Sequence, residues 1–248
     1  MNPLLAFQLR RVGRNKQYLF FTVLLPALFT IFITKIIGGQ MGDAAGYDEV
    51  AASVMVSMMA YGALGAALGA TIRISFDRAS GWLRQLRITP VPQTQVFAVD
   101  VAVGAILALP SLVVVALVGR FVNGVQLGTG TWAVLVGVLW AGSIAFVALG
   151  LLIGLSLEEK AAGGAIGILG TMLAALGGLW WPVEMFPEPM QVLAWFTPSY
   201  WYAEMGRDVA AGTAPALLPV VALTAFTAVF AALAVTVARR RPLHAVSG

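Results

Sequence analysis

Few side chains of this 248-residue chain could act as acids, bases, nucleophiles or metal ligands. Cysteine is absent and the one histidine, His244, lies in a polar tail, which excludes thiolate or histidine-rich metal sites and disulfide frameworks. Asp100 and Glu204 are the main carboxylates within apolar stretches, and they fall near opposite membrane surfaces. An enzyme acting on lipid within the membrane needs its acids and bases at one depth, so it would have to use loop carboxylates. We therefore predict neither a catalytic nor a metal site, and keep that enzyme as an alternative.

The connection at residues 73–95 reads RISFDRASGWLRQLRITPVPQTQ and is longer than a simple link between two apolar runs requires. A helix over residues 78–88 would separate apolar from basic side chains, with Trp82, Leu83 and Leu86 on one face and Arg84 and Arg87 on another. Thr89-Pro90 would end this helix. The pattern predicts a short amphipathic helix at a membrane surface, either docked on a partner or lying there alone.

A second informative stretch, residues 178–212, is called the lid segment here. It remains too apolar for a solvated loop and holds eight aromatic residues and four prolines: Trp180, Trp181, Phe186, Trp195, Phe196, Tyr200, Trp201, Tyr202, Pro182, Pro187, Pro189 and Pro198. About ten residues separate Pro187 from Pro198, which is too few to cross a bilayer. The segment is either an aromatic belt at the outer interface or a set of re-entrant or interfacial helices that form a lid over a pathway.

The elements that position these segments must be membrane-spanning helices. Apolar residues make up 60% of the chain and charged residues 10%, against roughly 45–50% and about 25% in soluble domains. Because each span needs roughly 20 residues, the length permits about six spans and no large domain outside the membrane. Six long apolar runs are present, at residues 18–37, 51–72, 97–119, 132–155, 162–181 and 216–238. We predict an all-α membrane protein formed as a single domain over residues 1–248.

The basic residues indicate how these spans are oriented. Twelve of the 15 Lys and Arg residues fall in alternate connections on one side, and only Lys35, Arg120 and Arg207 fall on the other. The positive-inside rule then places both termini in the cytoplasm, which requires an even number of spans and agrees with six. Since topology accounts for the distribution of the basic residues, the net charge of +4 does not indicate binding to nucleic acid.

The leader, residues 1–16, precedes the first span and is basic. Leu5, Leu9 and Val12 recur at helical spacing, while Arg10, Arg11 and Arg14 occupy other positions. This pattern predicts an amphipathic helix in contact with the lipid of the cytoplasmic headgroup layer, and a disordered basic leader is the alternative. The apolar run that follows is too long for a signal peptide and lacks a cleavage pattern, so we expect the first span to be retained.

Two of these segments resemble those of a known family. The residues Asp77-Arg78-x-x-Gly81-x-Leu83-x-x-Leu86-x-x-Thr89-Pro90 are similar to the [DE]-R-x-x-G-x-L-x-x-L-x-x-T-P signature that follows the second span of ABC-2 type transporter permeases. Within the lid segment, Gly178-x-x-x-Pro182-x-Glu184-x-x-Pro187, followed by Pro198, is similar to the outer segment of that family. Asp77 stands where Glu is commoner. The resemblance covers essentially the whole chain, including six spans and a basic leader.

This resemblance implies roles for the singled-out segments. The leader and a coupling helix at residues 76–90, called the coupling segment here, would dock a separate cytoplasmic ATPase, and the lid segment, including Trp181, would close the translocation path. No G-x-x-x-x-G-K-[ST] sequence is present, so ATP and Mg²⁺ would be bound by the partner and this chain would hold no cofactor. Two ATPase copies and a second permease, identical or related, would complete an exporter in a bacterial plasma membrane.

The function predicted from the sequence is therefore ATP-driven export of a hydrophobic or amphipathic molecule, such as a drug, a lipid or a lipid-linked compound. Apolar spans with few fixed charges favour such a cargo. An ATP-independent secondary transporter or channel is a further alternative. It would require paired ionisable residues or broken helices at the membrane midplane, and neither is evident in the sequence.

Overall fold

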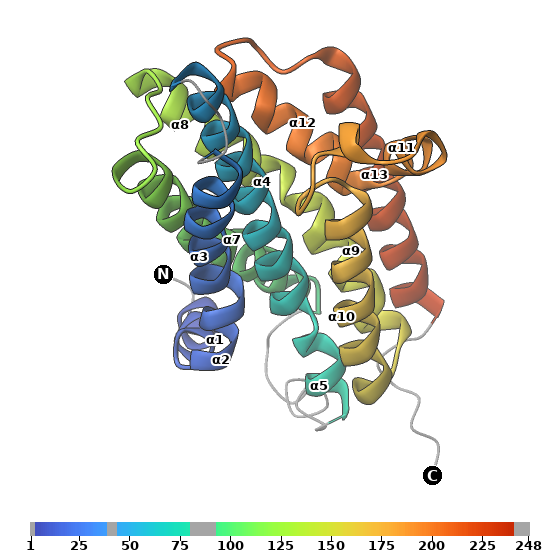
Figure 1. Cartoon of the computed structure of the whole chain (residues 1–248). Helices are drawn as coiled ribbons and strands as arrows, with labels where there is room; N and C mark the ends of the chain where they lie inside the picture. The colour runs from blue at the N-terminus through green and yellow to red at the C-terminus, as the bar shows by residue number, and fades with distance from the viewer. Residues whose placement is uncertain (1–2, 39–43, 80–92, 241–248) are drawn as a thin grey trace.

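The computed structural model describes residues 3–38, 44–79 and 93–240, and over these residues the chain is an all-helical bundle (Figure 1). Six helical stretches are long and apolar enough to cross a membrane, so the predicted class and number of spans are confirmed for the described part of the chain. They comprise the first span α2 (Lys16–Leu19), η1 (Phe20–Leu24), α3 (Leu25–Ile33) and η2 (Thr34–Gly38); the second α4 (Ala44–Thr71) with α5 (Arg73–Ala79); the third α7 (Gln93–Phe121); the fourth α8 (Thr129–Gly142) and α9 (Ile144–Ser156); the fifth α10 (Glu159–Leu176); and the sixth α13 (Leu217–Arg240).

The second span occupies the centre of the bundle. Helix α4 packs against α3, α7 and α9, and its residues Met55, Met59 and Leu64 are buried in the main apolar core. Gly62 permits close approach of α4 to its neighbours, since a Cβ atom there would lie 1.9 Å from Ser111 Oγ and 2.9 Å from the carbonyl oxygen of Thr22. A small residue on α4 therefore serves packing between spans one, two and three of the same chain.

The leader is helical as α1 (Pro3–Gly13), and the apolar residues predicted to share a face do so. Val12 is fully buried, and it packs with Leu5 and Leu9 against a cluster that includes Val99 and Val103 of α7. Figure 1 shows α1, α2 and α5 at one end of the bundle, here called the leader end. The location of α1 in the headgroup layer remains a prediction.

The lid segment contains short helices at the opposite end of the bundle, called the lid end (Figure 1). It comprises the turn η3 (Val183–Met185), α11 (Glu188–Trp195) and α12 (Pro198–Ala210), and none of these is long enough to be a candidate span. The fifth span ends at Leu176, five residues earlier than the run at 162–181 suggested, because Gly178 adopts a positive φ of +72° that breaks the helix. Residues 178–181 therefore belong to the lid segment and not to the fifth span.

Candidate functional site

At the leader end, one ion pair joins the leader to the start of the coupling segment. Arg11 Nη1 lies 3.1 Å from Asp77 Oδ1, which connects α1 to α5 across 66 residues of sequence. The Asp77 side chain is 9% exposed, whereas that of Arg11 is 47% exposed. A carboxylate held at this depth is costly without a cationic partner, so the pair fixes where α1 sits relative to α5.

Two further charged groups surround this ion pair. Arg73, at the first position of α5, donates from Nη1 to the carbonyl oxygen of Gln8 in the leader at 3.4 Å. Asp100, near the start of α7, is 7% exposed and interacts electrostatically with both Arg73 and Asp77. Two arginines and two aspartates thus lie together where the leader meets the second and third spans.

At the lid end, α12 is anchored to the fourth span. Tyr202 is fully buried, and its hydroxyl donates to the carbonyl oxygen of Leu139 at 2.6 Å. Its ring meets that of Phe146 edge to face, with centroids 5.2 Å apart, and packs so closely on Gly142 that a Cβ there would lie 2.7 Å from the ring. Burial raises the pKa of the Tyr202 phenol, so the hydroxyl remains a protonated donor. The tyrosine fills the break between α8 and α9.

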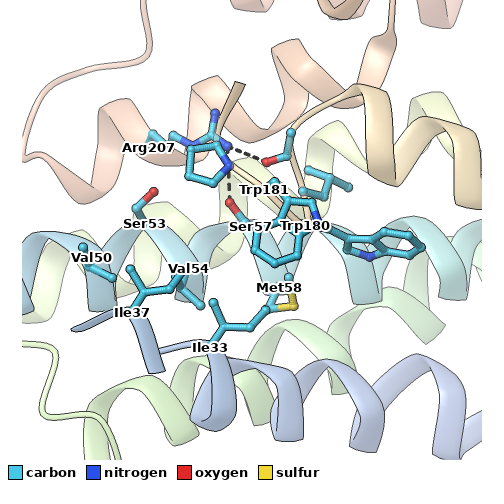
Figure 2. A pocket seen from close by; sticks show the side chains of 13 residues that line it. Ile33, Ile37, Val50, Ser53, Val54, Ser57, Met58, Trp180, Trp181 and Arg207 are labelled. Carbon is cyan, nitrogen blue, oxygen red and sulfur yellow. Dashed lines mark hydrogen bonds between the residues drawn. The ribbon is translucent and has the colours of Figure 1, made fainter. Parts of the chain in front are cut away.

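Arg207 makes the second anchor of α12 (Figure 2). Its Nη2 donates to Ser57 Oγ of α4 at 3.3 Å and to the carbonyl oxygen of Gly178 at 3.0 Å, while Nη1 pairs with Glu204 one turn earlier. The guanidinium therefore ties three parts of the chain together: the second span, the turn after α10, and α12 itself.

A small pocket of about 80 Å³ lies between these anchored elements. Figure 2 shows its lining, in which Ile33 and Ile37 come from the first span and Val54 and Met58 from the second. The rest of the wall is formed by residues 178–182 and Arg207 of the lid segment and by Val50, Ser53 and Ser57 of the second span. The lid segment therefore covers a pocket, as a lid over a pathway would, although the volume is too small for a large cargo in this conformation.

Comparison with known proteins agrees with this arrangement. The sequence profile described as "ABC-2 family transporter protein" matches residues 41–236, which include the second to fifth spans, most of the sixth, α5 and the lid segment. The chain belongs to the ABC-2 transporter family. It is also 27% identical to the protein named "Putative transport permease YvfS" of Bacillus subtilis (strain 168) over 237 residues, which cover 94% of this chain and 95% of that one.

The structure places several of the site residues expected of this ABC-2 permease, while the roles assigned to them stay predictions. In the leader, Arg10 and Arg14 are exposed, but Arg11 is paired with Asp77. Arg78 is part of helix α5, but its side chain is not in the part of the chain that the structure describes. The remaining signature residues also lie outside them: Gly81, Leu83, Leu86, Thr89 and Pro90.

The lid residues of the ABC-2 motif have mainly conformational roles in this structure. Pro198 is the first residue of α12, a position at which proline suits a helix start, and Pro187 lies immediately before α11. Pro182, Glu184 and Trp181 are exposed at the surface of the lid segment, with Trp181 at 55%. An exposed tryptophan at the end of a membrane bundle fits the predicted outer interface.

Arg207 and Tyr202 are the lid residues whose roles sequence reasoning missed. In the sequence, Arg207 is one of three basic residues on the predicted outer side, and Tyr202 is one of eight aromatic residues in the lid segment. The spacing of Glu204 and Arg207 three residues apart on an amphipathic helix was a readable signal for an ion pair. Nothing in the sequence indicated that Arg207 reaches Ser57, 150 residues earlier.

Replacing Gly178 with alanine should weaken the lid of this permease. The residue adopts φ +72°, and a Cβ would lie 2.4 Å from Val183 Cγ2, so the turn must shift as well as bear the left-handed conformation. We expect a loss of about 1–2 kcal/mol from the backbone conformation alone, measured as a lower melting temperature in detergent. Gly130→Ala is the control, because no atom lies within 4 Å of a Cβ there and the backbone carries no positive φ. Equal melting of the two variants would contradict the argument.

Proposed function

We propose that the chain is the membrane subunit of an ATP-driven exporter that moves a hydrophobic or amphipathic molecule out across a bacterial plasma membrane. Two copies of a cytoplasmic ATPase, which bind ATP and Mg²⁺, supply the energy. The leader and the coupling segment dock these ATPases on the cytoplasmic side, where both termini lie. The observation that carries the proposal is the Arg11–Asp77 pair, since it joins the two proposed docking elements into one unit.

The proposed mechanism is an equilibrium between two conformations that nucleotide binding shifts. Closure of the ATPases pushes the coupling segment, and α5 transmits the movement because it continues directly from the second span. The second span also contains Ser57, whose hydroxyl accepts a hydrogen bond from Arg207 of the lid segment. A displacement of the second span therefore changes the contacts that hold the lid, which a two-state mechanism requires.

A second permease copy is proposed to face the fifth span. Among the six spans, α10 has the lowest mean hydropathy, yet most of it lies at the surface of the chain. The sixth span is equally exposed but far more apolar, as lipid contact requires. Ala161, Gly164 and Gly167 are exposed on α10, and their small side chains allow close helix packing. This face suits another permease, with the translocation path between the two copies.

Cross-linking tests this placement directly, because the chain contains no cysteine. Gly167→Cys should give a covalent dimer when native membranes are treated with a short bis-maleimide, since α10 faces its counterpart. Gly137→Cys on the exposed surface of α8 is the matched control and should stay monomeric. A dimer from the control and none from Gly167→Cys would show that the copies meet elsewhere; dimers formed only with a related permease would indicate a heterodimer.

Purification tests the proposed function as a whole. The tagged chain, solubilised gently from native membranes, should carry a P-loop ATPase in a 1:1 ratio of ATPase to permease chains. Reconstituted into vesicles, the complex should move an amphipathic dye only with hydrolysable ATP. Flux catalysed by the purified chain alone, without ATP, would instead support a secondary transporter or channel.

A further inference from the structure

The pocket under the lid has one polar side that is rich in hydrogen-bond donors. Among its lining residues Arg207 is the single charged one, and Ser53 and Ser57 lie one turn apart on α4. Trp180 also lines the pocket, and its buried indole N–H has no hydrogen-bond partner within the described chain. Arginine and tryptophan side chains donate hydrogen bonds but cannot accept them, whereas the serine hydroxyls can do both, so donors predominate on this side.

The opposite side of the pocket is hydrocarbon. Ile33 and Ile37 of the first span face Val54 and Met58 of the second, with no charged residue among them (Figure 2). A buried donor without a partner is unfavourable, and an acceptor on a ligand would remove that cost for the Trp180 N–H. The pocket therefore matches a molecule with an alkyl group at one end and an oxygen-rich head at the other.

We infer that this pocket binds amphiphiles whose head group is an anionic oxygen acceptor, such as an alkyl phosphate or a phospholipid headgroup, with Arg207 and Trp180 as donors to the head. This inference rests on the proposed function, because the pocket is a cargo site only if the chain is part of an exporter. It deepens that function by naming the head-group chemistry of the exported molecules. The binding itself requires only the permease.

Glu204 sets the strength of this site. It pairs with Arg207 and so offsets the positive charge that an anionic head would meet. Removing that carboxylate leaves the guanidinium to the ligand, whereas removing the guanidinium leaves a negative charge beside it. Substitutions at the two positions should therefore change the affinity in opposite directions, a result that loss of folding could not produce.

The test uses the full chain in phosphatidylcholine nanodiscs, without an ATPase, titrated with hexyl phosphate while tryptophan fluorescence is recorded. We expect saturable binding that Arg207→Gln weakens about tenfold or more and Glu204→Gln strengthens. Trp180→Phe keeps an aromatic ring next to Tyr61 and removes the N–H donor together with the five-membered ring of the indole, so it should weaken binding by a smaller factor. Arg120→Gln is the control, because Arg120 lies on the same predicted side, against Trp132 and away from the pocket lining.

Further titrations identify the head and the source of the ligand. Hexyltrimethylammonium should not bind saturably, and inorganic phosphate should bind more weakly than hexyl phosphate because it leaves the apolar side empty. Weaker apparent binding of hexyl phosphate in phosphatidylglycerol nanodiscs would identify membrane lipid as the occupant, and unchanged binding would favour a diffusible amphiphile.

Equal binding of the cation, or affinities of Arg207→Gln and Glu204→Gln that match the unmodified chain, would overturn the inference. If an ATPase co-purifies but hexyl phosphate does not bind, only the inference fails. If hexyl phosphate binds but no ATPase co-purifies, the proposed function fails.

Discussion

Replacing Asp77 with arginine should reduce ATP-driven export at least tenfold, which corresponds to about 1.4 kcal/mol of lost coupling. The new guanidinium would face Arg11, which now pairs with Asp77, and Arg73 at the start of the same helix. Repulsion among three arginines would separate the leader from α5 and disturb the proposed docking surface. Dye export by reconstituted vesicles, normalised to the amount of assembled permease, measures the effect.

The charge swap Arg11→Asp with Asp77→Arg provides the decisive control. It restores an attractive pair in reversed order, so export should recover in part, while each single substitution remains defective. Recovery should be incomplete because Arg73 and Asp100 keep their original charges. Arg14→Asp, at an exposed position of the leader, tests whether any lost positive charge gives the same defect. If the double variant is as inactive as the single ones, the ion pair is not what couples the two segments.

Tyr202→Ala should be the most destabilising single substitution at the lid end, at about 3–5 kcal/mol, a typical cost for truncating a buried aromatic side chain. The ring is fully buried against Phe146 and Gly142, so truncating it leaves a cavity between α12 and the fourth span. The expected readout is a large drop in melting temperature of the purified permease, accompanied by a lid segment that proteases cleave more readily.

Two substitutions separate the contributions of this tyrosine. Tyr202→Phe keeps the ring and loses only the hydroxyl bond to Leu139, at a cost of about 1 kcal/mol, because that carbonyl still accepts from the Ser143 amide. Tyr200→Ala, two residues away and partly exposed, should cost much less than Tyr202→Ala. A similar loss for both alanine variants would show that α12 is not anchored through Tyr202.

The helical bundle was largely predictable from the sequence because each span must be long and apolar enough to cross the hydrocarbon core of the membrane. Long apolar runs and the distribution of basic residues indicated six helices, and the spacing of Leu5, Leu9 and Val12 indicated the buried face of α1. The end of the fifth span was placed too late, because apolar residues continue past Gly178 into the lid. Hydropathy alone does not show that a glycine adopts a positive φ and so ends a helix.

The candidate site was less predictable, since its contacts join distant parts of the chain. Asp77 was singled out by its motif, but the leader contains three arginines and the sequence did not distinguish Arg11 from Arg10 or Arg14. Likewise, a local ion pair of Arg207 could be read from spacing, but its contact with Ser57 depends on how α12 crosses the second span. Which arginine pairs with Asp77, and which residue Arg207 contacts on the second span, depend on tertiary packing, which one sequence does not reveal.

The ion pair at the leader end also has a consequence for biogenesis. Arg11 leaves the ribosome 66 residues before Asp77, so the leader has no partner for this contact until the second span has been synthesised and inserted. Before that point α1 also lacks the apolar surface of α7 that covers Val12. Attachment of the leader therefore reports that the first three spans are in place, and a quality-control protease that cuts a detached leader would selectively remove chains whose insertion has stalled.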